Sequence, residues 1–260
     1  MSDSKYPISA FVACQNEERN IEGCLRSVAW CDEIVVVDGF STDRTVEIAR
    51  RYTDKIFSRQ WDGYRSQKSF GLEQTSNNWA LLIDSDERLS PELIGEIQRE
   101  FDNGPGDTAG YYLPRRVHYL GKWISHCGWY PDHKLRLFRK DRGRLGGTDP
   151  HETCLLDGPA KHLRGELIHY TYRTISEHLR TIERYAAIWA STRRWRPGDA
   201  LRMLVRPLVK FLEIYIMKAG VLEGLHGYVI ASMASYSVFL RYAKLYERSA
   251  RAGRGEHSRG

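Results

Sequence analysis

Short apolar runs alternate with amphipathic stretches along the first part of the chain. The apolar runs are rich in large or β-branched side chains, as buried strands are, and they cover residues 8–14, 33–39, 55–61 and 78–84. The other stretches carry apolar residues at helical spacing and predict helices over residues 21–28, 41–49, 63–74 and 90–101. Strands that alternate with helices imply right-handed crossovers and a mostly parallel sheet, so we expect an α/β fold of the nucleotide-binding type.

Two of these helices have recognisable starts. Ser90 is a good N-cap, and Pro91 suits the first helical position because proline has no backbone N–H to lose there. The second helix has three candidate N-caps, Ser41, Thr42 and Asp43.

After Tyr172 the pattern changes to helices alone. Apolar spacing predicts three of them, with a break at residues 196–199, over residues 176–195, 200–220 and 222–247. The longest uncharged run, residues 227–240, is shorter than the roughly 20 residues that cross a bilayer. We therefore expect no conventional transmembrane helix, and a disordered tail over residues 248–260.

Composition is that of a globular protein with an uneven charge. Hydrophobic residues make up 42% of the 260 residues, enough for one large domain or for one domain with an appendage. Residues 1–110 carry 12 Lys and Arg against 20 Asp and Glu, whereas residues 111–260 carry 27 against 13. A basic half favours nucleic acid, anionic lipid or a phosphorylated acceptor, and an acidic half favours a divalent cation; solvated surface charge is the alternative.

The cysteine pattern and the motifs that the sequence lacks indicate the cellular compartment and the class of partner. The five cysteines are odd in number and lack the paired spacing of metal sites, and no charged-then-apolar signal peptide precedes Ile8. We therefore expect a reducing cytoplasm and no disulfide framework. The sequence has no helix-turn-helix, zinc or aromatic RNA-recognition motif, so no nucleic-acid partner is expected.

Polar side chains follow three of the predicted strands. Asn16 and Glu17 follow the first strand, Asp38 ends the second, and Asp84 and Asp86 follow the fourth. In parallel sheets the ligand lies across the carboxyl ends of the strands, where these groups should meet. A single carboxylate there could instead be a helix cap or a salt-bridge partner.

The segments VACQNEERNI, VVVDGFSTDRT and LLIDSDE together resemble the family 2 glycosyltransferases of the GT-A fold. The resemblance covers about residues 7–175 and implies a Rossmann-like, mostly parallel sheet flanked by helices, followed here by a C-terminal helical extension. The segment GWYPDHKLRLFRK and the PHE triplet at residues 150–152 resemble the branch that transfers glucose to the inner core of lipopolysaccharide.

This resemblance implies a UDP-sugar donor and a divalent cation, Mg²⁺ or Mn²⁺. In an extended D-S-D triplet alternate side chains point the same way, so the carboxylates of Asp84 and Asp86 can face the same side of the segment. By resemblance Asp86 contacts the metal, and Asp84 contacts the ribose or a metal-bound water. Asp38 then accepts hydrogen bonds from the uracil or the ribose, and Asn16 and Glu17 border the base.

Two further residues are candidates for the donor side. Lys68 suits the phosphates or the sugar, with a solvent-facing helix lysine as the alternative. His169 follows another apolar stretch and would supply a third metal ligand, as a downstream histidine does in some relatives. A satisfied core histidine is the alternative.

Transfer also needs a general base that takes the proton of the acceptor hydroxyl. In related enzymes this base is an acid after the strand that follows the acceptor region, and Glu152 lies in the corresponding place. Asp149 and Asp132 are its rivals, and His151 is a candidate to orient the acid or to bind acceptor. Each of these residues could instead have a capping or surface role.

We therefore expect an inverting glycosyltransferase that moves glucose from UDP-glucose to a lipopolysaccharide core or related anionic glycolipid. The expected division is a catalytic domain over residues 1–175, a helical extension over 176–247 and the tail over 248–260. The basic, aromatic extension predicts docking on the inner face of the cytoplasmic membrane, with subunit packing as a homo-oligomer or packing on the catalytic domain as alternatives. Other functions left open are transfer to a lipid phosphate or a polypeptide, and a non-catalytic protein that binds a sugar nucleotide or nucleic acid.

Overall fold

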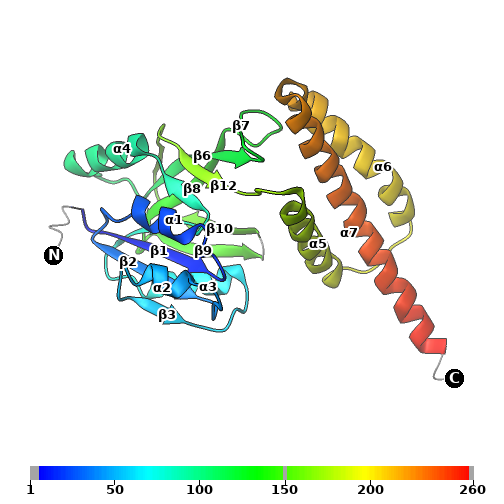
Figure 1. Cartoon of the computed structure of the whole chain (residues 1–260), viewed down its shortest axis with the longest axis horizontal. Coiled ribbons are helices and arrows are strands. Elements are labelled where there is room, and N and C mark those ends of the chain that lie inside the picture. The colour runs from blue at the N-terminus through cyan, green and yellow to red at the C-terminus, as the bar shows by residue number, and fades with distance from the viewer. Residues whose placement is uncertain (1–5, 149–150, 258–260) are drawn as a thin grey trace. The chain divides into compact units, whose positions relative to one another are not determined.

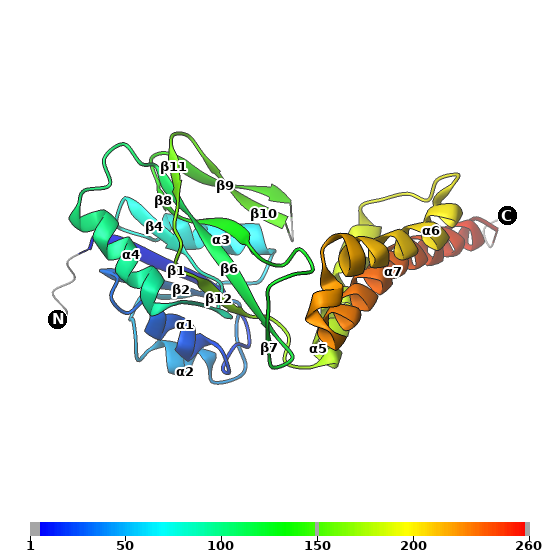
Figure 2. The same ribbon diagram turned by 90° about the horizontal axis from the view of Figure 1, so that it is seen from above.

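The computed structural model describes residues 6–148 and 151–257. The chain forms two compact units. The first comprises Met1–Arg116 and Pro131–Tyr170, and the second comprises Val117–Tyr130 and Thr171–Gly260. Figures 1 and 2 show the first unit as an α/β layered body and the second as a group of helices.

Four parallel strands form the first half of the main sheet. They lie in the order β3-β2-β1-β4, and their bounds are β1 Ile8–Cys14, β2 Glu33–Asp38, β3 Ile56–Ser58 and β4 Trp79–Leu82. Every residue of β1, β2 and β4 is buried, as the continuous apolar runs predict. The third strand is shorter than the expected 55–61: its pairing with β2 ends at Ser58, and the last backbone bond to β2 runs from the Arg59 amide to the Asp38 carbonyl.

Four helices follow these strands in the predicted order, and their bounds are α1 Ile21–Ser27, α2 Thr45–Ala49, α3 Tyr64–Glu73 and α4 Pro91–Asp102. Ser90 Oγ accepts from the Leu93 amide, so both the predicted cap and the proline at the helix start are confirmed. The α2 prediction was wrong by a few residues, since Arg44 occupies the N-cap position without a side-chain cap. Asp43 Oδ1 instead accepts from the Thr45 amide at 3.0 Å.

The second half of the sheet adds strands of mixed direction. β8 (Asp132–Arg139) runs antiparallel to β4, and the path continues through β6 (Gly110–Tyr119) and β12 (Leu167–Tyr170) to β5 (Glu87–Leu89). The remaining strands are β7 Lys122–Ile124 and β11 Ala160–His162, which pair with β6, and the hairpin of β9 Gly143–Thr148 and β10 His151–Leu156. The α/β class is confirmed.

Apolar side chains fill both faces of the sheet. Because side chains alternate along a strand, β1 sends Ala10 and Val12 to one face and Phe11 to the other. The first face packs against α1, α2 and α4 through side chains such as Leu25, Ile48, Leu93 and Ile97. The second face packs against α3 and the β9–β10 hairpin, through Leu72, Leu145, Cys154 and Leu156.

The second unit is built mainly from helices, whose bounds are α5 Ile175–Ser191, α6 Asp199–Leu212, a π-helical turn η1 Glu213–Met217, a 3-10 turn η2 Gly220–Glu223 and α7 Leu225–His257. The α-helix expected over residues 200–220 ends at Leu212 and continues as the π-helical turn η1. The turn is π-helical because the Lys218 amide bonds back to the Glu213 carbonyl, five residues earlier. Residues 248–257 lie in α7, where the sequence predicts a disordered tail. Among the described residues, none of the helices is both long enough and apolar enough to span a membrane.

Candidate functional site

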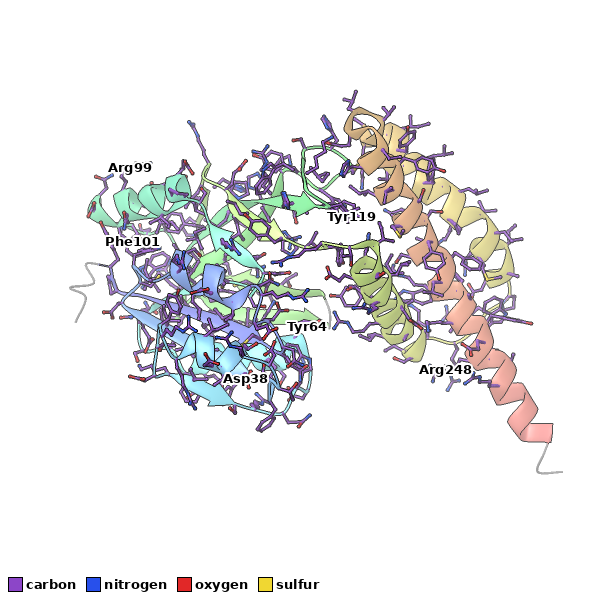
Figure 3. The ribbon with its side chains drawn as sticks, viewed as in Figure 1. Asp38, Tyr64, Arg99, Phe101, Tyr119 and Arg248 are labelled. Atoms are coloured by element: carbon purple, nitrogen blue, oxygen red, sulfur yellow. The ribbon has the colours of Figure 1, made fainter. Side chains whose placement is uncertain are left out.

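Asp38 lies at the carboxyl end of β2 and is 2% exposed (Figure 3). Its Oδ2 accepts from the Ser41 amide at 3.0 Å, which ties it to the loop that follows the strand. Its Oδ1 is buried and has no hydrogen-bond partner among the described residues. Because a buried carboxylate oxygen without a partner is costly, this oxygen is well suited to accept a hydrogen bond from a bound ligand.

Asn16 and Glu17 shape the neighbouring loop. Asn16 has a positive φ of 56° and its Oδ1 accepts from the Thr42 amide at 2.8 Å. The Glu17 amide donates to Thr45 Oγ1 at 2.7 Å. The structure therefore brings the loops after β1 and β2 together at the same edge of the sheet as Asp38. The predicted contacts of Asn16 and Glu17 with the base stay predictions.

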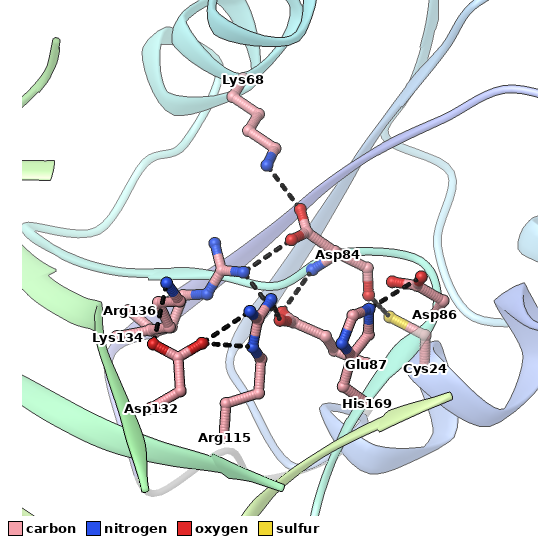
Figure 4. Close-up of polar contacts among 10 residues, drawn as sticks. All are labelled: Cys24, Lys68, Asp84, Asp86, Glu87, Arg115, Asp132, Lys134, Arg136 and His169. Carbon is pink, nitrogen blue, oxygen red and sulfur yellow. Dashed lines mark hydrogen bonds and ion pairs between the residues drawn. The ribbon is translucent and has the colours of Figure 1, made fainter. Parts of the chain in front are cut away.

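The D-S-D triplet forms a turn, and the expectation of an extended segment was wrong. The Glu87 amide donates to the Asp84 carbonyl at 2.9 Å, and the Asp84 amide donates to Glu87 Oε2 at 3.0 Å. These reciprocal bonds curl the chain between β4 and β5. The two aspartates consequently have different partners (Figure 4).

Asp84 is neutralised by two cations. Lys68 Nζ lies 2.6 Å from Asp84 Oδ1, and Arg136 Nη2 lies 2.6 Å from Oδ2 (Figure 4). Burial by itself raises the pKa of the Asp84 carboxyl, but Arg136 and Lys68 outweigh it and hold that pKa well below its usual range. Lys68 is 3% exposed, so the alternative of a solvent-facing lysine is wrong.

Gly71 explains how a helix lysine becomes buried at this edge. A Cβ at Gly71 would lie 3.2 Å from side-chain atoms of Phe11 and Val37, so the glycine permits close contact between α3 and the sheet. Lys68 lies one turn earlier on the same helix and is carried with it towards Asp84.

Glu87 and two arginines complete the charge network and were not predicted as site residues. Glu87 is fully buried, and its Oε1 accepts from Arg136 Nη2 at 2.8 Å. Arg115 Nη1 lies 3.6 Å from the same oxygen. The sequence signal was available for Arg136, because the strand KLRLFRK alternates Lys134 and Arg136 with apolar residues and so turns both cations to one face.

Asp86 and His169 form a separate pair. His169 Nε2 lies 3.1 Å from Asp86 Oδ2, because β12 places His169 opposite Glu87 on β5 and the Tyr170 amide donates to the Asp86 carbonyl. Burial lowers the pKa of His169, but the charge and hydrogen bond of Asp86 together raise it above its usual value. His169 Nδ1 is buried without a partner among the described residues.

This pair fits a divalent cation that keeps open positions for a ligand. Mg²⁺ is bound by one or two carboxylates together with water and substrate phosphates, and carboxylate oxygens suit Mn²⁺ as well, so Asp86 supplies the preferred donor and His169 a further nitrogen donor. Within the described chain no group of three His, Cys, Asp or Glu side chains could hold a metal. Asp86 and His169 would therefore supply two ligands, and the remaining ligands would come from substrate and water.

Of the candidate general bases, Asp132 has a described side chain, whereas Glu152 and Asp149 do not. Asp132 is bound by Arg115 at 2.6 Å and by Lys134 at 3.0 Å, and these cations outweigh burial and lower its pKa, which makes Asp132 a weak proton acceptor. The backbone of Glu152 lies in β10 opposite Gly147. The side chains of Glu152 and His151 and the whole of Asp149 lie outside the described residues.

Comparison with known proteins gives one family. The model of the family described as Glycosyl transferase family 2 matches residues 9–154. The lipopolysaccharide core biosynthesis glycosyltransferase LpsC of Rhizobium meliloti is 32% identical over 255 residues, which cover 95% of this chain and 94% of LpsC. An uncharacterized glycosyltransferase of Rickettsia typhi is 29% identical over 258 residues, covering 94% of this chain and 88% of that protein.

Similarity to solved structures is weaker. A glucosyl-3-phosphoglycerate synthase from Mycobacterium tuberculosis, solved with Mn²⁺ and UDP-glucose, aligns with a TM-score of 0.35 and 22% identity over 43% of each chain. A likeness of this size supports no conclusion about the ligands of this chain.

Proposed function

The chain belongs to glycosyl transferase family 2, and on that premise we propose that it transfers glucose from UDP-glucose to a lipopolysaccharide core or related anionic glycolipid. Its α/β architecture is of the GT-A type. The full-length similarity to LpsC supports the choice of acceptor class. Residues 1–175 are proposed as the catalytic domain and residues 176–247 as its helical extension.

The observation that carries this proposal is the different pairing of two neighbouring carboxylates. Asp84 is held by two cations, whereas Asp86 faces a histidine that can share a metal with it. Such a pair supports a divalent-cation site beside a carboxylate fixed in position by Lys68 and Arg136. The open oxygen of Asp38 supports a hydrogen bond to the uracil or the ribose at the same sheet edge.

The reaction follows from these roles. Asp86 and His169 would hold Mg²⁺ or Mn²⁺, which when bound supplies positive charge that stabilises the leaving diphosphate. Asp84 would accept from the ribose hydroxyls or from water on that cation, and Lys68 and Arg136 keep it ionised and oriented. The acceptor hydroxyl attacks the anomeric carbon opposite the diphosphate, and Glu152 takes its proton. An α-linked donor therefore gives a β-linked product.

Donor screening tests this proposal. We expect UDP-glucose to bind in the presence of Mn²⁺ or Mg²⁺ and to bind more weakly with a chelator, and GDP- and dTDP-sugars to bind less well. Turnover is then measured with lipopolysaccharide core acceptors, lipid phosphates and polypeptides. Metal-dependent transfer to either of the last two would replace the acceptor proposed above. Binding of UDP-glucose without hydrolysis or transfer would indicate a non-catalytic protein.

Substitution of the proposed base tests the mechanism. Glu152→Gln keeps the shape of the side chain but removes the proton acceptor, so turnover should fall by about 10²- to 10⁴-fold while donor affinity is unchanged. Calorimetry with UDP-glucose and Mn²⁺ measures the affinity, and NMR of the product measures the linkage. Near-normal turnover would transfer the role to Asp149 or Asp132, and an α-linked product would contradict inversion.

A further inference from the structure

A row of large apolar side chains lies exposed along α6 and the turns that follow it. We call this row the α6 surface. Its members are between 50% and 81% exposed, and they are Leu201, Leu204, Leu208, Leu212, Ile216, Met217, Leu222 and Leu225. Soluble proteins rarely expose contiguous apolar patches of this kind without a binding partner.

Packing within the second unit does not account for this row. The first members lie three or four residues apart and therefore on one side of the helix. A different set of α6 residues faces the neighbouring helix α7: Pro207 is buried, and the Phe211 ring lies 5.6 Å from the Tyr228 ring of α7. The helix α6 is consequently apolar on two sides, and only one of them is used inside the unit.

Basic residues border the α6 surface. Arg202, Arg206 and Lys210 recur every four residues and form a stripe beside the exposed leucines. Residues 193–218 carry seven Lys and Arg against two Asp and Glu. The two acids pair with members of this stripe, Asp199 with Arg202 and Glu213 with Lys210, and seven cations against two acids still leave the segment a net charge of +5. The partner should therefore combine an apolar layer with negative charge.

We propose that the α6 surface inserts into the interface of an anionic membrane, with the leucines among the acyl chains and the basic stripe at the headgroups. An amphipathic helix of this composition lies in the plane of the interface and does not cross it. A second copy of the chain fits the surface less well, because a twofold interface would bring two basic segments together. The proposal adds an insertion step to simple electrostatic attraction and stands independently of the sugar-transfer reaction.

Vesicle binding of the full chain tests the proposal without donor or acceptor sugar. The probe is phosphatidylcholine vesicles with or without phosphatidylglycerol. We expect co-sedimentation with the anionic vesicles and much less with the neutral ones. Leu204→Glu with Leu208→Glu should lower the partition coefficient by roughly 100-fold, because two exposed leucines no longer enter the acyl region.

A matched control separates insertion from charge. Ser176 and Ala187 are exposed on α5, and their replacement by Glu adds the same two charges away from the α6 surface. This control should bind anionic vesicles much as the wild type does. A second α6 variant, Leu204→Ser with Leu208→Ser, adds no charge and should lower partitioning by roughly tenfold. Thermal unfolding of every variant verifies the fold.

Three outcomes would overturn the proposal. The first is equal binding of the wild type and the α6 variants. The second is an equal loss in the α6 variant and the α5 control, since this would reduce the effect to net charge. The third is a wild-type dimer without vesicles that the α6 substitutions dissociate, which would assign the surface to a second copy.

Discussion

Arg136 governs the balance of charge at the sheet edge. Its Nη2 lies close to both Asp84 and the fully buried Glu87, and both anions raise the pKa of Arg136 even though burial opposes this. A buried carboxylate depends on such a partner, because the cost of removing it from water is compensated only by close charge pairing.

Loss of Arg136 should therefore destabilise the first unit strongly. We expect Arg136→Met to lower the free energy of unfolding by about 3–5 kcal/mol, since the fully buried Glu87 would lose the cation that lies 2.8 Å from its carboxylate. Arg139→Met in the same strand breaks a solvent-exposed pair with Asp141 and should lower the free energy of unfolding far less than Arg136→Met does. Urea unfolding measures both, and equal losses would show that Arg136 is not a special partner.

Asp86→Asn should weaken metal binding and leave the fold intact. Removing the charge takes away a metal ligand, while the Asp86 carbonyl still accepts from the Tyr170 amide. Calorimetric titration with Mn²⁺ in the presence of UDP should show at least about a tenfold loss of affinity. Asp141→Asn, an exposed carboxylate of the same unit, serves as the control. Unchanged Mn²⁺ affinity in folded Asp86→Asn would exclude Asp86 as a ligand.

At the scale of elements, α4 has a defined start that can be tested. Ser90→Ala removes the oxygen that accepts from the Leu93 amide and should cost about 1 kcal/mol. Ser90→Thr keeps an acceptor at the same position and should restore most of that stability. Chemical denaturation of the two variants measures the difference, and a loss of the same size in both would point to packing around Ser90 and not to capping.

The elements that sequence predicts best are those with an uninterrupted local pattern. β1, β2 and β4 are buried on both faces, and α4 has both a cap and a proline, so each is recognisable without its neighbours. β5 has three residues, and its pairing with β12 joins segments far apart in the chain, which no local pattern records.

The candidate site divides in the same way. Asp38, Asp84 and Asp86 stand out because each follows or ends an apolar run. Their partners do not, because Arg136 lies 52 residues from Asp84 and His169 lies 83 residues from Asp86. Such pairs depend on which strands become neighbours. The segment KLRLFRK is recognisable as a strand, now part of β8, but its pairing with β4 and β6 was not predicted from the sequence.

At the scale of the whole molecule, the second unit should be sensitive to mild acid. His178 is buried, its ring stacks on that of Tyr172 with centroids 4.2 Å apart, and its Nδ1 lies 3.0 Å from the Tyr119 hydroxyl. Burial lowers the pKa of His178 to about 4, so the folded state binds fewer protons than the unfolded state as pH falls from about 6.5.

Stability should consequently fall by about 2 kcal/mol between pH 7 and pH 5 through this residue. In His178→Asn this part of the pH dependence should disappear, although the variant is less stable at both pH values. His169 has a raised pKa and acts in the opposite direction, so the comparison is made between wild type and variant at each pH. Parallel pH profiles would contradict the assignment to His178.

The second unit is built from two separate segments of the chain, residues 117–130 and 171–260, which limits how it can be inherited or exchanged. The polypeptide passes between the two units after Arg116, Tyr130 and Tyr170. The core of the second unit accordingly contains Tyr119 and Ile124 from the β6–β7 segment as well as residues of α7. Glu223 of η2 also accepts hydrogen bonds from the Ser125 and His126 amides of this segment, so polar as well as apolar contacts join the segment to the helices.

A stop codon after residue 170 would therefore not release the first unit alone, because the product would still carry the β6–β7 segment of the second unit without the helices that cover its apolar side chains. For the same reason, recombination at a single point between residues 130 and 171 would combine the β6–β7 segment of one protein with the helices of another. The helices of the second unit therefore cannot be exchanged between proteins without the β6–β7 segment. The similarity to LpsC across 95% of the chain is what we expect if both units are inherited together.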